Sequence, residues 1–280
     1  MAWTTADGGH ESNSISHGDK LGGPVVSLYS TDTTQQLPLG YRIADDSGRV
    51  FRYAHFVSAV GPGKLAAIDT SVGIQASING KLTDSAASAK DDYGTGDSTI
   101  YLTDTDSFGT SDAADVFAGG FLQITDAAGE GYNYRIKSND VGTSAGLIRL
   151  DLYDNLAAAL DSETSVAIIG NPYKNLAVAN AGTDDCLAGV AVANAGAAEF
   201  GWVQTWGVCN VLGDGAATIA AGTIAVLSDD DDGGVQPIGG ASFNSQDDIA
   251  LSLATEPVVG YFMTAITDGE YGPVYLQLCA

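Results

Sequence analysis

Basic residues are scarce in this chain. Only 11 lysines and arginines accompany 35 aspartates and glutamates, which gives a formal net charge of -24 over 280 residues. A chain this acidic repels phosphate backbones and anionic lipid headgroups. We therefore expect neither nucleic acid nor a membrane surface to be its partner.

Long hydrophobic runs are missing as well. The longest bland apolar stretch, residues 216–227, is interrupted by Gly222 and is shorter than the ~20 residues that a membrane helix requires. A secretory signal has a basic segment followed by an apolar one. Residues 1–20 carry three carboxylates and lack that pattern. We expect a soluble protein made without an export signal of its own.

Cysteine is limited to three widely spaced positions with no Cys-x-x-Cys pair. This spacing favours neither a disulfide framework nor a zinc site. We interpret the three as small buried hydrophobic residues. They are Cys186, Cys209 and Cys279.

The chain also lacks a convincing catalytic motif. Residues 142–146 match Gly-x-Ser-x-Gly, but a nucleophile elbow needs a helix after Ser144 and a histidine later in the chain. Residues 147–152 alternate like a strand, and His10, His17 and His55 all precede the serine. No phosphate-binding glycine loop is present either. We predict that the protein is not an enzyme and uses no cofactor.

Short runs with alternating apolar and polar residues are what the chain does contain. They recur at short intervals, at residues 99–102, 121–124, 132–137, 147–152 and 166–169. Residues 41–44 and 49–53 flank a turn closed by Gly48 and predict a hairpin, and residues 126–131 predict a second antiparallel turn. Such spacing predicts an all-β fold of antiparallel β-barrel or sandwich modules with an extended N-terminal arm.

The composition along the chain divides it into four parts. Residues 1–36 are rich in Gly, Ser, Thr and Asp and are expected to form the arm, which is either mobile or ordered across another subunit. Residues 37–68 hold the first hairpin of a β-body, and residues 69–170 form an inserted or added β-domain. Residues 171–280 form a C-terminal β-module that completes the body.

Two acidic segments were considered as cation sites. Asp104, Asp106, Asp112 and Asp115 have part of the spacing of a calcium loop, but Phe108 stands at a ligand position and a strand precedes the loop. They are weak calcium candidates, and a solvated loop is the preferred interpretation. Residues 229–232 are four adjacent aspartates, which repel one another unless a cation or water separates them. For these we expect an exposed turn and no metal.

The segment from Phe200 to Val208 predicts a strand with unequal faces. Strict alternation places Phe200, Trp202, Trp206 and Val208 on one face and small residues on the other. Trp202 and Trp206 either stack against sugar rings or are buried in the module or between subunits. We favour burial.

Three segments together resemble structural head proteins of tailed bacteriophages, of the capsid decoration or cement type. They are residues 39–54, 129–137 and 201–207, and the layout of strands in the last 80 residues is similar too. The resemblance implies a β-barrel or sandwich, a homotrimer, and the major capsid protein as partner. It also implies a place on the outer surface of the virion capsid after assembly in the host cytoplasm.

In this interpretation the chain stabilises the shell and needs no catalytic residue. The candidate contacts with the capsid or another subunit are Trp3, Leu21, Val25, Val26, Tyr29, Trp202 and Trp206. One alternative is a phage fibre or spike β-domain that binds host glycans through exposed aromatic residues. Another is an extracellular β-protein stabilised by calcium.

Overall fold

The structure is a computed structural model. It describes residues 26–68, 80–82, 93–103, 113–142, 147–161, 163–181, 186–215, 219–238, 257–267 and 269–279. Within these ranges the regular elements are all strands, so the predicted all-β fold is confirmed.

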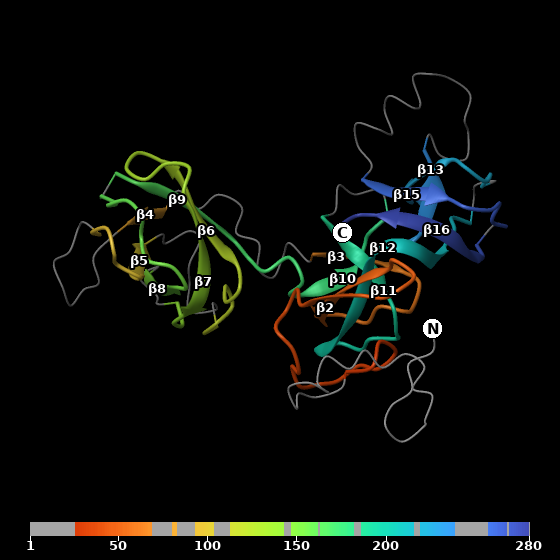
Figure 1. The fold of residues 1–280 in the computed structure, drawn as a ribbon, viewed down its shortest axis with the longest axis horizontal. Helices are drawn as coiled ribbons and strands as arrows, with labels where there is room; N and C mark the ends of the chain where they lie inside the picture. Colours follow the sequence, from red (N-terminus) through yellow and green to blue (C-terminus); the bar gives the residue numbers. More distant parts are fainter. Residues whose placement is uncertain are drawn as a thin grey trace. The chain divides into compact units, whose positions relative to one another are not determined.

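The chain divides into two compact units, one of residues 1–68 and 173–280 and the other of residues 69–172. We call the first the body and the second the barrel unit (Figure 1). The sequence analysis placed an added domain at residues 69–170. The barrel unit is an insertion in the chain between the two parts of the body.

The body contains one sheet of ten strands. Its first part curls into a ring, because β12 pairs with both β11 and β2, and β10 and β3 connect those two strands. The strands of this part are β1 (Arg42–Ala44), β2 (Val50–Phe56), β3 (Leu65–Ile68), β10 (Leu176–Val178), β11 (Leu187–Ala191) and β12 (Glu199–Leu212). β1 and β2 are antiparallel with Ile43 opposite Phe51, which confirms the predicted first hairpin.

The second half of β12 continues the sheet away from the ring. It pairs with β16 (Tyr271–Gln277), and the sheet goes on through β15 (Val258–Phe262) and β13 (Ile224–Leu227) to β14 (Val235–Pro237). One face of this extension packs into a buried cluster that includes Val211, Phe262, Val274 and Leu276. Each of these four side chains is fully buried.

The barrel unit is closed by six strands in the order β4-β5-β8-β7-β6-β9, with β4 and β9 paired. They are β4 (Gly80–Leu82), β5 (Thr99–Thr103), β6 (Phe121–Asp126), β7 (Asn133–Asn139), β8 (Leu147–Leu152) and β9 (Ser165–Ile169). All the pairings are antiparallel, including the predicted pair on either side of residues 126–131. Alternate residues enter a core that contains Leu122, Ile136 and Leu150.

Residues 26–36 pack on the strands of the body, although the sequence analysis assigned them to an arm that is either mobile or ordered across another subunit. Leu28 is buried beside Phe51 and Trp202. Asp32 exchanges two backbone hydrogen bonds with Phe200, of 3.0 and 2.7 Å, and the Gln36 N–H donates to the Tyr53 hydroxyl. Residues 1–25, which make up the rest of the predicted arm, lie outside the described part of the chain.

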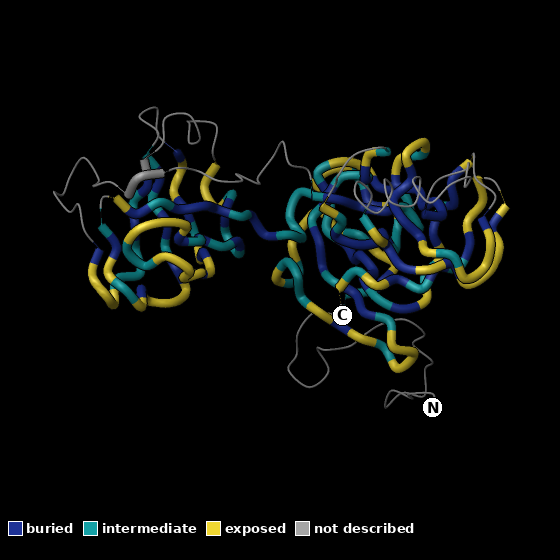
Figure 2. The backbone as a smooth tube through the Cα atoms, turned by 90° about the horizontal axis from the view of Figure 1, so that it is seen from above, coloured by how far each residue is buried: buried dark blue, intermediate teal, exposed yellow. Residues whose placement is uncertain are grey.

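Burial differs along the strands of both units (Figure 2). The strands are largely buried, and the connections between them carry most of the exposed backbone. Exposed positions on barrel strands such as β7 are polar, whereas several on strands of the body are apolar, and these lead to the candidate site.

Candidate functional site

A bulge in β12 separates the two tryptophans that the sequence analysis placed on one face. Trp202 lies opposite Tyr53, but the register with β2 shifts between Gln204 and Trp206, so that Trp206 lies opposite Val50. Val50 and Tyr53 face opposite sides of β2, because they are three residues apart in a regular strand. The prediction of one shared face is therefore wrong, and Trp206 and Val208 point away from Trp202.

Trp202 and Trp206 consequently have different surroundings. Trp202 is buried and makes an edge contact with Tyr53 at 5.3 Å between ring centroids. Trp206 is half-buried and makes an edge contact with Tyr275 at 6.0 Å. Trp202 thus belongs to the core of the body, and Trp206 belongs to a surface.

That surface is a row of apolar residues across four strands. Ile224 of β13 lies opposite Tyr261 of β15, Tyr261 lies opposite Tyr275 of β16, and Tyr275 lies opposite Val208 of β12. Directly opposed residues in antiparallel strands share a face. With Trp206 beside Tyr275, we call these five residues the apolar row.

The apolar row is ordered by aromatic contacts as well as by the sheet. Tyr261 and Tyr275 are stacked, with centroids 5.2 Å apart and planes at 12°. Three members remain well exposed, Ile224 at 42%, Tyr261 at 38% and Val208 at 45%. The opposite face of the same strands is the buried core, so the apolar row lies on the outward face of a sheet whose inward face is already buried.

A groove of about 490 Å³ adjoins the row. Val208 and Tyr271 line it from the sheet, and Tyr29 lines it from the first described segment. Arg49 is also at its wall, where its guanidinium is held by Asp45 at 2.7 Å and lies over the Phe51 ring at 5.3 Å. The groove therefore combines aromatic rings with a cation that is already paired.

The other predicted contact residues divide between this surface and the undescribed ranges. Tyr29 is 53% exposed at the groove, and Val26 is half-buried in a smaller pocket of about 190 Å³ next to Phe200. Trp3, Leu21 and Val25 lie outside the described residues. The structure thus brings Tyr29 and Trp206 to the surface of the body near Val208, and it places Trp202 inside.

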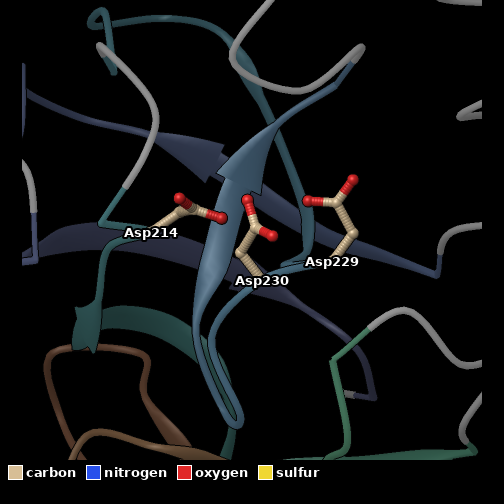
Figure 3. Close-up of side chains that lie close together, drawn as sticks. All are labelled: Asp214, Asp229 and Asp230. Atoms are coloured by element: carbon tan, nitrogen blue, oxygen red, sulfur yellow. The ribbon is translucent and has the colours of Figure 1, made fainter.

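A carboxylate cluster lies elsewhere on the body (Figure 3). Asp214 follows β12, and Asp229 and Asp230 lie in the turn between β13 and β14. Their carboxylate oxygens are within 4.8 Å of one another, and Figure 3 shows Asp214 and Asp230 pointing toward each other. Asp214 is buried, whereas Asp229 and Asp230 are exposed.

Hydrogen bonds explain how the four adjacent aspartates fit into one turn. The buried Ser228 hydroxyl donates to Asp214 Oδ2 at 2.6 Å and accepts the N–H groups of Asp230 and Asp231. Asp231 accepts the Gly215 N–H at 2.7 Å, and Asp232 accepts the Ala181 N–H at 3.0 Å. Two of the four carboxylates therefore hold backbone in place.

The remaining carboxylates repel one another. The charge of Asp229, followed by that of Asp214, raises the pKa of Asp230. Three carboxylates at this spacing offer oxygen ligands of the kind that calcium and magnesium prefer. This cluster is the group of described residues with the donor chemistry of a cation site, and sequence reasoning missed the contribution of Asp214 because it is distant in the chain.

The predicted calcium loop is mostly outside the described residues, as Asp104, Asp106 and Asp112 all fall there. Asp115 is described and exposed, with a positive φ of 60°. Its backbone N–H donates to Asn139 O at 2.9 Å, which fixes the turn before β6. The assignment of these residues to calcium remains a prediction.

The interpretation of the cysteines is wrong for two of the three. Cys186 and Cys279 are exposed, because each lies at the end of a strand rather than inside one. Cys209 is half-buried against the core of the body, and burial raises the pKa of its thiol to about 12. That thiol is protonated at neutral pH and is a poor nucleophile.

His55 is the one histidine within the described ranges. Its Nδ1 lies 3.2 Å from Asn175 Oδ1, and its ring packs on Phe200 at 4.7 Å. Burial lowers the pKa of His55.

Residues 147–152, which follow Ser144 closely, form strand β8, as predicted, so the Gly-x-Ser-x-Gly match lacks the helix that a nucleophile elbow requires.

Four members of the apolar row, Val208, Ile224, Tyr261 and Tyr275, were not predicted as contacts. The available signal was the outward series Tyr271, Pro273 and Tyr275 in β16, where alternation continues but the outward residues are not polar.

The described residues contain no helix long and apolar enough to cross a membrane. Comparisons with family models, curated proteins and solved structures gave no match.

Proposed function

We propose that this chain is a structural virion protein that binds the outside of an icosahedral phage capsid and stabilises it. Its partner is the major capsid protein, and its working form is a homotrimer on the outer surface of the virion. The observation that carries the proposal is the apolar row on the β-body, which gives the chain a surface for protein–protein contact in a multimeric assembly. A protein that cements other proteins needs such a contact surface and needs no activated nucleophile.

The physical argument rests on repetition. A single small contact gives weak binding, but linked subunits that bind at several points of a lattice gain a high effective concentration at each further point. The net charge of -24 keeps the unbound protein soluble and disfavours binding to the packaged nucleic acid. Both properties suit a protein added to the outside of a shell.

Shell binding tests the proposal directly. Shells assembled from the major capsid protein of the encoding phage are mixed with the full chain and sedimented, and the bound chain is quantified. Decoration predicts saturable cosedimentation and shells that resist heat to a higher temperature. Shells that bind no chain, or that bind it without a gain in stability, would overturn the proposal.

Deletion of residues 1–25 tests the role of the predicted arm in the same assay. The structure makes this a better variant than removal of residues 1–36, because Leu28 is part of the core of the body and Asp32 pairs with Phe200. We expect the shortened chain to fold and to lose most of its affinity for shells. Unchanged binding would show that residues 1–25 do not contact the shell and that the body makes the contact.

A glycan-binding fibre or spike domain is the second candidate, and the groove favours it. Tyr29 and Tyr271 are exposed aromatic residues at its edge, and Gln204 and Asn210 supply polar groups along its wall. A glycan array separates the two functions. A decoration protein gives no specific signal, whereas a receptor-binding domain retains a defined set of sugars and loses it when Tyr271 is replaced by Ala.

A further inference from the structure

We infer that the apolar row is the surface through which copies of this chain associate. The inference rests on the multimeric form in the proposed function and identifies where its subunits meet. It names Val208, Tyr261 and Tyr275 as the centre of the contact, with Ile224 and Trp206 beside them.

The first argument is that the described residues leave one face of the sheet extension exposed. Val274 and Leu276 of β16 are fully buried on one side, while Tyr271 on the other side is 45% exposed. Met263, just after β15, is 43% exposed. Together with the row, these side chains present several hundred Å² of apolar surface, which is about the size above which monomeric soluble proteins rarely leave a patch uncovered.

The second argument is the absence of charge. The segments 206–212, 224–227, 258–262 and 271–277 contain no Asp, Glu, Lys or Arg, although charged residues make up 16% of the chain. Two copies that each carry a formal charge of -24 repel one another wherever carboxylates meet. The sheet extension is a surface where copies can approach without that repulsion.

The third argument is the chemistry of the side chains. Tyrosine and tryptophan are enriched in the centres of protein interfaces, where they bury a large area with little loss of conformational freedom. Tyr261 and Tyr275 are already held by their stacking and Trp206 by its edge contact with Tyr275. Rows of this kind can meet around a symmetry axis, where each subunit presents the same residues.

The groove continues the same surface. Val208 and Tyr271 belong to both, and Tyr29 stands at the opposite wall. A neighbouring copy that covers the row also covers the opening of the groove.

Sedimentation equilibrium of the full chain tests the inference. We expect the wild-type chain to sediment as a multiple of its mass of 28.5 kDa, and Val208→Asp to weaken association at least tenfold. Val141→Asp is the matched control, since Val141 is 55% exposed on the barrel unit. It should associate like the wild type. A wild-type chain that is monomeric at all concentrations, or a Val208→Asp chain that associates normally, overturns the inference.

A second pair of variants covers the case in which Val208→Asp does not fold. Tyr261→Ser removes one stacked ring from the row, and Tyr132→Ser removes one from the stacked pair Tyr132 and Tyr134 in the barrel unit. Both should keep the circular dichroism of the wild type. Dissociation by Tyr261→Ser alone supports the inference, and equal behaviour of the two variants contradicts it.

The shell-binding assay fails independently of this one. A chain that associates through the row but ignores shells keeps the inference and refutes decoration. A chain that decorates shells but is monomeric in solution and on the lattice supports decoration and refutes the inference.

Discussion

The body and the barrel unit are built from strands with the same alternation but with different outward residues. In β8 of the barrel unit, Ile148 and Leu150 point inward, and Arg149 and Asp151 point outward. In β16 of the body, Val274 and Leu276 point inward, and Tyr275 points outward. The barrel strand gives its outer face to water, whereas the body strand keeps an apolar face that water does not favour.

In both units, the alternation of apolar residues along a strand indicates which face is buried in the core. The residues on the other face indicate whether that face meets water or another protein. The barrel unit closes on itself and ties three strands together through Asp151, which accepts hydrogen bonds from Thr99 and Ser138. In the body, the outward face of the sheet extension carries the apolar row where the barrel unit has polar residues. We therefore assign association to the body.

The largest expected effects separate the cores of the two units. Leu150→Ala in the barrel unit should lower its unfolding free energy by about 2–5 kcal/mol, and Phe262→Ala should lower that of the body by about 3–5 kcal/mol. Both side chains are fully buried. Hydrogen exchange measured by mass spectrometry reports each unit separately. Equal loss of protection in both units from either change would show that they do not unfold independently.

Ser228→Ala sharpens the comparison within the body. The change removes a buried hydroxyl that bonds Asp214 and two backbone amides, so each of those groups loses one hydrogen bond. The expected loss is about 1–3 kcal/mol. Denaturant unfolding followed by tryptophan fluorescence measures it, since Trp202 and Trp206 lie in the body and residues 69–172 contain no tryptophan. A neutral result would mean that the turn of aspartates is held without this serine.

Asp151→Asn tests the polar outer face of the barrel unit. Burial raises the pKa of Asp151, but the Thr99 hydroxyl and the Arg149 charge outweigh it and hold that pKa below its ordinary value. A lowered pKa in the folded state contributes stability above the pKa of the unfolded state. That stability is lost as the pH falls through the folded pKa.

We expect Asp151→Asn to cost about 1–2 kcal/mol at pH 7 and to flatten the acid dependence of the barrel unit. Asp45 is the matched position in the body, where Ser47 and Arg49 lower its pKa against the effect of burial. Asp45→Asn should change the acid unfolding of the body only. Acid titrations followed by hydrogen exchange distinguish the units, and an unaltered acid profile of the barrel in Asp151→Asn would contradict this account.

The smallest expected effect is that of Asp230→Asn. The exposed Asp230 carboxylate is opposed first by the charge of Asp229 and then by that of Asp214. Removing its charge should raise the melting temperature slightly at low ionic strength, and added salt should erase the difference. A lower melting temperature in Asp230→Asn would instead show that the carboxylate makes a favourable contact.

Local patterns were enough to predict the fold class and the two hairpins. Each of the turns at residues 45–48 and 126–131 begins with an Asp that is followed three residues later by a Gly, so the pairing of their flanking strands needs no distant information. The bulge between Gln204 and Trp206 could not be predicted, because it depends on how β12 meets β2. It reversed the face of Trp206 and with it the assignment of the surface.

The site was harder to predict because its members come together only in the sheet. Ile224 and Tyr261 are far apart in sequence and meet through the register of β13 and β15. Asp214 joins Asp229 and Asp230 in the same way. The exposed cysteines were mispredicted because β11 begins just after Cys186 and β16 ends before Cys279, so neither residue lies within a strand.

Hydroxyl-radical footprinting at low and high protein concentration tests the contrast between the two units most directly. It reports the exposure of individual side chains, and Tyr261, Met263, Tyr132 and Tyr153 are all more than a third exposed in the single chain. The account predicts that association protects Tyr261 and Met263 of the body and leaves Tyr132 and Tyr153 of the barrel unit equally reactive. Protection of the barrel tyrosines with no change at Tyr261 would contradict it.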